Sequence, residues 1–261
     1  MSEMNWDREV DVLVVGTGNG GLTAAVCNWE MGTKDILIIE KQDKVGGTSA
    51  TSGGGIWIPN NHYAKEVGAE DNPADAKAYL TNTLFGEDVP EEMIDVYLQK
   101  APEMLKYLHD RTDVRYESLA EYPDYYTNVE GAREGHRSLE PSPIMASELG
   151  ENWKNMTWTH FMMRMFNRIH FTQVEAHLLM VQLPGWKTLL AKLMWDYVRD
   201  IPWRFKTPIS RRLACGSAGV ARLYLSVLKR EIPLEFNTQM VELIAEGDTV
   251  LGAVIECNGQ R

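Results

Sequence analysis

Three glycines and one glutamate near the N-terminus have the types and spacing of a dinucleotide site. Gly16, Gly18 and Gly21 form a G-x-G-x-x-G pattern, and Glu40 follows about 20 residues later. In such a pattern the first glycine permits a tight turn, and the second lets the backbone approach a pyrophosphate. The third lets a helix pack closely on a strand. Glu40 can accept hydrogen bonds from a ribose.

The elements around these residues provide the context that the motif requires. An apolar run at 12–15 predicts a buried parallel strand, residues 22–31 a helix, and residues 36–39 a second buried strand ending at Glu40. The start of the helix offers free N–H groups and partial positive charge to phosphates. This context disfavours a glycine-rich turn without a ligand. It does not separate NAD from FAD.

The segment after the acidic strand end favours FAD. Residues 41–59 are rich in glycine, serine and threonine, with three consecutive glycines at 53–55. Such a loop can wrap a pyrophosphate and lie against a flat ring without steric conflict. A simple nicotinamide-binding unit usually proceeds from the acidic strand into an ordinary helix. The alternative is a flexible loop without a ligand.

Composition indicates a globular protein and narrows its partners. The chain has 261 residues, 44% hydrophobic and 24% charged, with a formal charge of −11, which argues against nucleic acid as a partner. Its three cysteines have no metal-binding spacing, so we predict thiols in a reducing compartment and no metal. The polar N-terminus does not resemble a signal peptide, and no run of 18 apolar residues exists. These features predict a cytoplasmic location.

Local patterns predict further helices and a hairpin. Asn72 and Pro73 are suited to the N-cap and first position of a helix to about Leu84, with Gly86 ending it. A second helix after 88–90 has an apolar stripe. Its members are Met93, Val96, Tyr97, Met104, Leu105 and Leu108. Residues 220–230 predict another helix, and 234–240, 243–245 and 250–255 predict strands with a turn at 246–248.

Residues 151–208 differ in character from the rest of the chain. They hold five of the eight tryptophans, six of the thirteen methionines, and eight Lys or Arg residues against four Asp or Glu. Two stretches, 167–183 and 186–199, permit amphipathic helices. One interpretation is a helical cover packed on the body. The other is a surface helix at a lipid interface, which makes the protein peripheral to a membrane.

A tyrosine cluster is the second candidate for chemistry. Tyr122, Tyr125 and Tyr126 lie in one loop, followed by Arg133 and Arg137. A tyrosine can present a ring to a flat apolar substrate and a hydroxyl to a carbonyl or a catalytic group. By composition alone, packing is the more frequent role of such a cluster. The two arginines are expected to hold the loop.

Four segments of the sequence together resemble a known family. VVGTGNGGLTAA, EKQDKVGGTSATSGGG, IWIPNN and EYPDYYTNVEGAREGHRSLEP are similar to the fumarate reductase and 3-ketosteroid dehydrogenase flavoproteins. The last two segments point to the 3-ketosteroid Δ1-dehydrogenase branch. The resemblance covers most of 8–145 and resumes around 209–261.

The resemblance implies an α/β fold and an FAD-dependent oxidoreductase acting on CH–CH groups. The implied fold is a Rossmann-like FAD-binding domain, a parallel sheet with helices plus a β-hairpin, and residues 151–208 are an implied insertion. Tyr125 falls where the family has an active-site tyrosine that supports a tyrosinate base, and the backbone at Met240 contacts adenine. Without a histidine in 46–55, FAD is expected to be noncovalent. The expected FAD-contacting residues are Gly16, Gly18, Asn19, Gly20, Gly21, Glu40, Lys41, Gly46, Gly47, Thr48, Ser49, Ser52, Gly53, Gly54 and Met240.

The family reaction desaturates a 3-ketosteroid, with the C1 hydride going to the flavin N5 and the C2 proton to a tyrosine base. It requires an external electron acceptor. In the family, the base and the groups that polarise the C3 carbonyl lie in a substrate domain, and a C-terminal return segment cradles the flavin. Neither follows in these 261 residues, so we expect an inactive N-terminal part of an FAD-binding domain. The alternatives are a fumarate-reductase-like enzyme acting on another enone or unsaturated acid, and a non-catalytic nucleotide- or membrane-binding product.

Overall fold

The computed structural model describes residues 6–84 and 88–257. The main helices are α1 (Asn19–Glu30), α2 (Gly47–Thr51), α3 (His62–Glu66), α4 (Pro73–Thr83), α5 (Glu91–Arg111), α6 (Gln173–Val181), α7 (Trp186–Arg199), α8 (Ile201–Arg204) and α9 (Cys215–Lys229), with 3₁₀ helices η1 (Ala146–Asn155) and η2 (Phe161–Met163). The strands are β1 (Val12–Val15), β2 (Ile36–Ile39), β3 (Ile56–Trp57), β4 (Tyr116–Ser118), β5 (Ser138–Pro141), β6 (Ile144–Met145), β7 (Arg164–Met165), β8 (Ile169–His170), β9 (Arg212–Leu213), β10 (Leu234–Glu235), β11 (Thr238–Glu246) and β12 (Thr249–Cys257).

A parallel sheet of order β1-β2-β10 carries the glycine motif, as the sequence predicts. The central strand β2 is buried along its whole length, which explains why its sequence is uniformly apolar. Helix α1 begins at Asn19, three residues before its predicted start, because Gly20 and Gly21 are already helical. Val15, at the end of β1, is 51% exposed.

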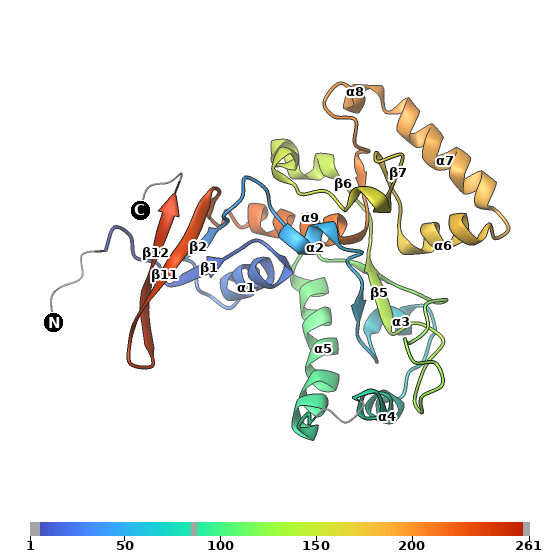
Figure 1. Cartoon of the computed structure of the whole chain (residues 1–261), viewed down its shortest axis with the longest axis horizontal. Coiled ribbons are helices and arrows are strands. Elements are labelled where there is room, and N and C mark those ends of the chain that lie inside the picture. The colour runs from blue at the N-terminus through green and yellow to red at the C-terminus, as the bar shows by residue number, and fades with distance from the viewer. Residues whose placement is uncertain (1–5, 85–87, 258–261) are drawn as a thin grey trace.

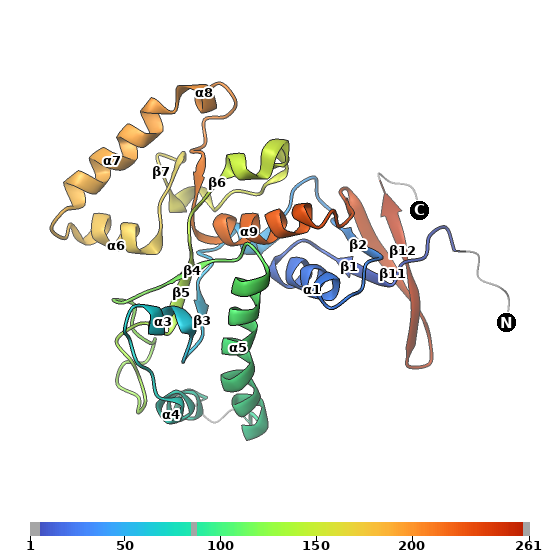
Figure 2. The same cartoon turned by 180° about the vertical axis from the view of Figure 1, so that it is seen from behind.

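Helix α9 forms the centre of the molecule and packs against α1, α2 and η1 (Figures 1 and 2). Twelve of its fifteen residues are buried. It begins at Cys215, not at Val220 as predicted, because the small residues at 215–219 are themselves helical and lie under other chain segments. At Gly216, an added Cβ would lie 2.1 Å from the Ser49 carbonyl oxygen.

A second sheet of order β3-β5-β4 is antiparallel and lies beside α5. Helix α4 confirms the predicted start, since the Asn72 side chain accepts a hydrogen bond from Ala74 N. Its expected stop at Gly86 lies outside the described residues. Part of the predicted α5 stripe is wrong. The exposed members are Met93, Val96, Tyr97 and Met104, whereas Ile94, Ala101, Leu105 and Leu108 form the buried face.

Residues 151–208 are less helical than predicted. The helix expected at 167–183 starts only at Gln173, because Ile169–His170 pairs with Arg164–Met165 in a hairpin. Trp153 and Trp203 are buried and stack at 4.9 Å between ring centroids. These two tryptophans belong to the main core and are not available to a lipid surface.

The C-terminal hairpin β11–β12 extends from the sheet at one end of the molecule (Figure 1). The predicted strand 234–240 is in fact two strands. Leu234–Glu235 joins the parallel sheet as β10, and the chain then turns into the longer β11. The predicted turn at 246–248 is confirmed, since Thr249 already pairs with Glu246.

Candidate FAD and substrate site

The end of β1 and the start of α1 border a cavity of about 860 Å³. The residues that line it include Gly16, Gly18, Glu40, Lys41, Gly47, Thr48, Ser49 and Met240. These come from four separate stretches of sequence that the parallel sheet brings to one edge. No side chain caps α1 at Gly18, whereas Asn72 caps α4 and Thr172 caps α6. Apart from Asn19 N, which donates to Ser49 Oγ, the N-terminus of α1 therefore retains N–H groups for an anion.

The geometry requires glycine at Gly21, favours it strongly at Gly16 and leaves little room for a side chain at Gly18. Gly16 has a φ of +93°, which disfavours a residue with a side chain. A Cβ at Gly21 would lie 2.0 Å from the Gly16 carbonyl oxygen, so only glycine permits α1 to approach β1 this closely. At Gly18, a Cβ would contact Ser49 Oγ at 3.3 Å. Ser49 Oγ accepts a hydrogen bond from Asn19 N at 3.1 Å and thereby joins the two glycine-rich segments.

Glu40 has a buried carboxylate with acceptor capacity remaining. It is 6% exposed, and its Oε2 accepts hydrogen bonds from the backbone N and the hydroxyl of Thr17. Its Oε1 accepts one from Gln42 N at 3.0 Å. An ionised carboxylate offers about four lone-pair sites, so Oε1 can accept another donor from the cavity. This is the arrangement that a ribose hydroxyl needs.

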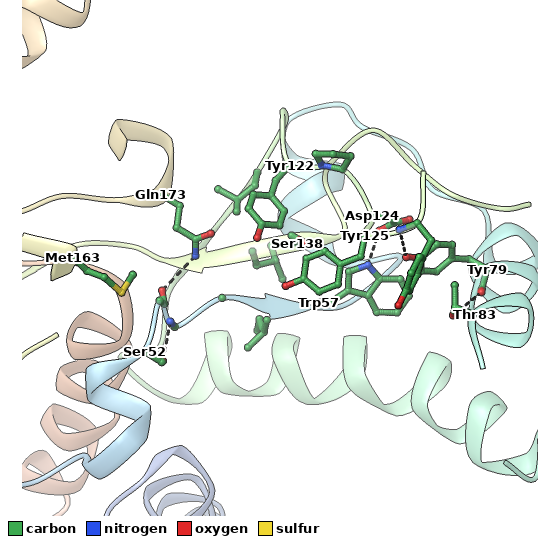
Figure 3. Close-up of a pocket in the computed structure, with 18 residues that line it drawn as sticks. Ser52, Trp57, Tyr79, Thr83, Tyr122, Asp124, Tyr125, Ser138, Met163 and Gln173 are labelled. Carbon is green, nitrogen blue, oxygen red and sulfur yellow. Dashed lines mark hydrogen bonds between the residues drawn. The ribbon is translucent and has the colours of Figure 1, made fainter. Parts of the chain in front are cut away.

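A second cavity has a volume of about 680 Å³, and Figure 3 shows the side chains that line it. Helix α2 and the residues that follow it contribute to both cavities. Gly47, Thr48 and Ser49 line the first cavity, and Ser52, Gly53 and Gly54 line the second. The remaining wall of the second cavity is largely apolar and aromatic. It includes Ile56, Trp57, Tyr79, Leu119, Leu139, Tyr122, Tyr125 and Tyr126.

Tyr125 lies at the mouth of this cavity and is 84% exposed. Burial and the neighbouring Tyr125 raise the pKa of Tyr122, which keeps the Tyr122 hydroxyl protonated beside that residue. Figure 3 shows both rings on the same wall. The cavity therefore combines an apolar surface with phenolic hydroxyls.

A buried ion-pair network holds the tyrosine loop. Asp124 accepts hydrogen bonds from Trp57 Nε1 at 2.6 Å, Arg133 N at 2.9 Å and Arg137 Nη1 at 2.8 Å. Arg137 also pairs with Asp71 at 2.9 Å and is 1% exposed. The expectation that the arginines hold the loop is thus met, with Arg137 as the buried member. The sequence reasoning did not identify Asp124 or Asp71 as its partners.

Residues 151–208 also reach this site. Gln173, the first residue of α6, donates from Nε2 to the Gly53 carbonyl at 3.3 Å, as drawn in Figure 3. Its backbone N donates to the carboxylate of Glu140 at 2.6 Å. Burial raises the pKa of Glu140, whereas hydrogen bonds from the backbone N–H groups of Gln173 and Val174 act to lower it. Nothing in the sequence around Gln173 indicated this contact, because it joins segments 120 residues apart.

The two cavities contain most of the residues predicted to contact the cofactor. Gly16, Gly18, Glu40, Lys41, Gly47, Thr48, Ser49 and Met240 line the first, and Ser52, Gly53, Gly54 and Tyr125 line the second. Four predicted residues line neither cavity: Asn19, Gly20 and Gly21 begin helix α1, and Gly46 is the N-cap of α2. Thr17, which lines the first cavity and binds Glu40, was missed. Its position inside the glycine motif was the available signal.

The donor set fits FAD. An uncapped helix start suits the pyrophosphate, a buried carboxylate suits the ribose, and a glycine loop with little side-chain bulk suits the flat ring. At Gly54, φ is +72° and an added Cβ would meet Gly216 N at 2.7 Å, so the loop is packed tightly on α9 from behind. Within residues 6–84 and 88–257, no cluster of three or more His, Cys, Asp or Glu could hold a metal ion.

Comparison with known proteins agrees with this geometry. Residues 11–261 match the family model described as an FAD binding domain. The chain is 34% identical to a 3-oxosteroid 1-dehydrogenase of Comamonas testosteroni, over 98% of this chain and 44% of that protein. It is 38% identical to a 4-oxocyclohexanecarboxylate 2-dehydrogenase of Sinomonas cyclohexanicum, over 53% of this chain and 24% of that protein.

A solved structure shows the same arrangement. The crystal structure of 3-ketosteroid Δ1-dehydrogenase from Sterolibacterium denitrificans, in complex with 1,4-androstadiene-3,17-dione, superposes with a TM-score of 0.89 at 36% identity. The match covers 96% of this chain and 45% of that one. The chain thus spans somewhat under half the length of these steroid-dehydrogenase relatives. It belongs to the FAD-binding domain family of flavin-dependent oxidoreductases, in which it is similar to the 3-oxosteroid 1-dehydrogenases.

Proposed function

We propose that this chain supplies the FAD site and one wall of the substrate site in an enzyme that desaturates a 3-ketosteroid between C1 and C2. The observation that carries the proposal is the apolar aromatic cavity that begins at the glycine loop and ends at Tyr125. A steroid nucleus is flat and apolar and suits such a wall. The names of the relatives support the choice of substrate class.

The proposed reaction removes a proton from C2 and a hydride from C1, which leaves a double bond between them. FAD, when bound, accepts the hydride. Tyr125 would support a tyrosinate base through its hydroxyl, with Tyr122 beside it in the same cavity wall. Ser52, Gly53 and Gly54 line this cavity and would contact the flavin ring. Because residues 46–55 contain no histidine, these residues would hold FAD noncovalently.

On this proposal the chain is the N-terminal part of the FAD-binding domain. The base and the groups that polarise the C3 carbonyl come from the portion of the relatives that this chain does not match. An external electron acceptor reoxidises the flavin. The chain alone is therefore expected to retain FAD after gel filtration and to show no steroid-dependent bleaching of the flavin absorbance.

The test of substrate and of Tyr125 uses the chain joined to the remaining portion of a steroid-dehydrogenase relative, the portion that this chain does not match. Anaerobic addition of a 3-ketosteroid should bleach the flavin absorbance, and Tyr125→Phe should slow bleaching about a hundredfold, the low end of acid–base contributions. The matched control is Tyr126→Phe, which should change the rate little. Bleaching by 4-oxocyclohexanecarboxylate but not by steroids would contradict the steroid assignment and favour the second candidate, a cyclic-ketone dehydrogenase. That candidate rests on the 38% identical relative.

We also propose a peripheral membrane contact through α7 and α8. Trp195 and Val198 are exposed on α7, Ile201 is exposed on α8, and the 88% exposed Phe205 directly follows α8. Cations at Lys187, Lys192 and Arg199 lie along α7, and Lys206 follows Phe205. This combination is typical of a helix at a lipid interface. Among the described residues, no helix is long and apolar enough to span a membrane.

Co-sedimentation with phosphatidylcholine vesicles tests the contact. The double variant Trp195→Ser, Phe205→Ser should bind vesicles at least about tenfold more weakly, since each buried aromatic contributes roughly 1.5–3 kcal/mol. Met31→Ser, which removes an exposed side chain at the end of α1, should not change binding. Equal binding of all three proteins would show that α7 and α8 do not contact lipid.

A further inference from the structure

Part of the 151–208 region lies along the glycine-rich loop and forms one wall of the second cavity. Thr157 N and His160 N donate at 3.0 and 3.2 Å to backbone carbonyls just before α2 and at its last residue, so this segment follows α2. Farther along the chain, Met163 and Gln173 line the second cavity. Figure 3 shows both at the end of that cavity where Ser52 lies.

The start of α6 is anchored to the body of the molecule on two sides. Glu140 of β5 is 1% exposed, and its carboxylate accepts hydrogen bonds from the first two N–H groups of α6 at 2.6 and 3.4 Å. Thr172 and Glu175 form a capping box, and Glu175 also pairs with Arg212 of β9 at 2.9 Å. The first three N–H groups of α6 thus all have acceptors, which fixes the position of Gln173.

The side chains of Gln173 and Ser52 bind the two polar groups of one peptide unit in the glycine loop. Gln173 Nε2 donates to the Gly53 carbonyl at 3.3 Å, and Gly54 N donates to Ser52 Oγ at 3.0 Å. This carbonyl and this N–H belong to the same peptide, the one between Gly53 and Gly54. Ser52 Oγ is itself held, since it donates to the Ser49 carbonyl at 2.8 Å. Hydrogen bonds at both ends therefore set the orientation of the peptide.

Neither residue of this peptide has a side chain that could hold it in place. Glycines on both sides of a peptide permit more backbone conformations than other residues do, so the loop depends on its hydrogen bonds. A Cβ at Gly55 would lie 3.0 Å from Gln173 Nε2 and one at Gly53 3.7 Å, which places the amide directly against the run of three glycines. Without this donor the Gly53 carbonyl would lose its partner, and other orientations of the peptide would become populated.

We propose that Gln173 is a positioning residue for the flavin, which it orients through the Gly53–Gly54 peptide. The inference rests on the proposed function, in which Ser52, Gly53 and Gly54 contact the flavin ring. A residue that locks the groups in contact with a cofactor favours one orientation of that cofactor over others. The 151–208 region thereby has a role at the site that is separate from its proposed membrane contact.

Titration of the FAD-free protein with FAD tests this role, together with the visible circular dichroism of the bound flavin, which reports the surroundings of the ring. Gln173→Leu removes the amide donor with little change in volume. It should weaken FAD binding about two- to tenfold, the equivalent of one ordinary hydrogen bond, and change the dichroism of the bound flavin. Gln182→Leu is the matched control, because Gln182 is exposed at the other end of the same helix. It should leave both measurements unchanged.

Gln173→Glu provides a rescue that depends on pH. A protonated carboxyl group keeps an O–H donor for the Gly53 carbonyl, whereas an ionised one has none. Glu140 faces this position from β5 and disfavours a second negative charge, while Glu175 on α6 is neutralised by Arg212. FAD affinity and dichroism of the variant should therefore approach those of the parent, measured at the same pH, as the pH is lowered from about 8 to about 5.

Two results would overturn the proposal. If Gln173→Leu matched Gln182→Leu in FAD affinity and dichroism, the peptide would not depend on the amide. If Gln173→Leu lost stability in urea but kept the dichroism of the parent, Gln173 would only hold α6 on the body. Neither measurement uses a steroid, so a failure of steroid oxidation would contradict the proposed function alone. If the chain alone does not retain FAD, the same variants are measured in the chain joined to the remaining portion of a relative.

Discussion

Replacement of Gly21 by alanine is expected to abolish FAD retention and to lower the free energy of unfolding by more than about 3 kcal/mol, the upper end of ordinary overpacking costs. The added Cβ would lie 2.0 Å from the Gly16 carbonyl oxygen and 3.1 Å from its carbon. The obstacle is backbone, which cannot turn aside as a flexible side chain can. Helix α1 must therefore move away from β1, and its N-terminus leaves the edge of the first cavity. Urea denaturation and the flavin absorbance retained after gel filtration measure the two effects.

Gly20→Ala is the matched control on the same turn of α1. A Cβ there meets nothing within 4 Å, and Gly20 lines neither cavity. Alanine in a helix is favoured over glycine by roughly 0.5–1 kcal/mol, so the variant should be as stable as the parent or more so. It should also retain FAD. If both variants lost stability and FAD to a similar extent, the close packing of Gly21 on Gly16 would not be the reason for glycine at position 21.

Replacement of Arg137 by glutamine is expected to cost about 3–5 kcal/mol of stability, the range for removing one partner of a buried ion pair. Arg137 is 1% exposed and neutralises Asp71 and Asp124 at 2.9 and 2.8 Å. Without it, two carboxylates remain in the interior. The loop that presents Tyr125 should loosen, because Asp124 lies beside that residue in the sequence. Urea denaturation at pH 7 measures the loss of stability.

The pH dependence of the Arg137 variant separates lost charge pairing from lost packing. Burial alone would raise the pKa of Asp71, but hydrogen bonds from Arg137, Asn60 N and Asn72 N hold it below its ordinary value of 3.8. In the parent, ionised Asp71 therefore stabilises the fold fully above pH 3.8, the ordinary pKa of the group. This stabilisation is lost as the pH falls through the lowered pKa of Asp71. In the variant, burial dominates and the pKa should rise, so a lower pH relieves the unpaired charge. The stability difference should narrow between pH 7 and about pH 4.5.

Arg133→Gln is the control for the Arg137 variant. Arg133 pairs with Asp75 at 2.8 Å, with both side chains about 40% exposed, and it lies 3.6 Å from Asp71, a longer contact than that of Arg137. Pairs made by a partly exposed arginine contribute about 1 kcal/mol or less. Its stability change should be correspondingly small and should not depend on pH in the same way. A pH-independent loss in Arg137→Gln would indicate that the arginine acts by filling space.

The sequence by itself determined the nucleotide-binding half of the site. Gly16, Gly18, Gly21 and Glu40 lie within one strand–helix–strand unit, so their spacing along the chain already fixes their spacing in space. The same holds for Asn72 and Pro73 at the start of α4, where the cap is a contact between near neighbours. Local rules of turn geometry, capping and strand burial were sufficient at these positions.

The extents of several elements were decided by tertiary contacts. Residues 215–219 are helical because α9 is buried among α1, α2 and η1, and their small side chains gave no periodic signal. The face of α5 that is buried contains Ile94 and Ala101, not Met93 and Val96, because the β3-β5-β4 sheet packs on that side. Trp153 and Trp203 lie in the core for a similar reason. An apolar residue alone does not reveal which of several surfaces will cover it.

Only the tertiary structure assembled the charged groups. Asp71, Asp124 and Arg137 meet across as many as 66 residues of chain, and His170, Arg204 and Arg211 surround a cavity formed by separate elements. Gln173 reaches Gly53 over 120 residues. Long-range pairs of this kind leave no spacing pattern in a single sequence, because the distance between partners along the chain is set by the path of the fold. Loss of one partner of such a buried charged pair is costly, since burial removes the water that would otherwise screen the remaining charge.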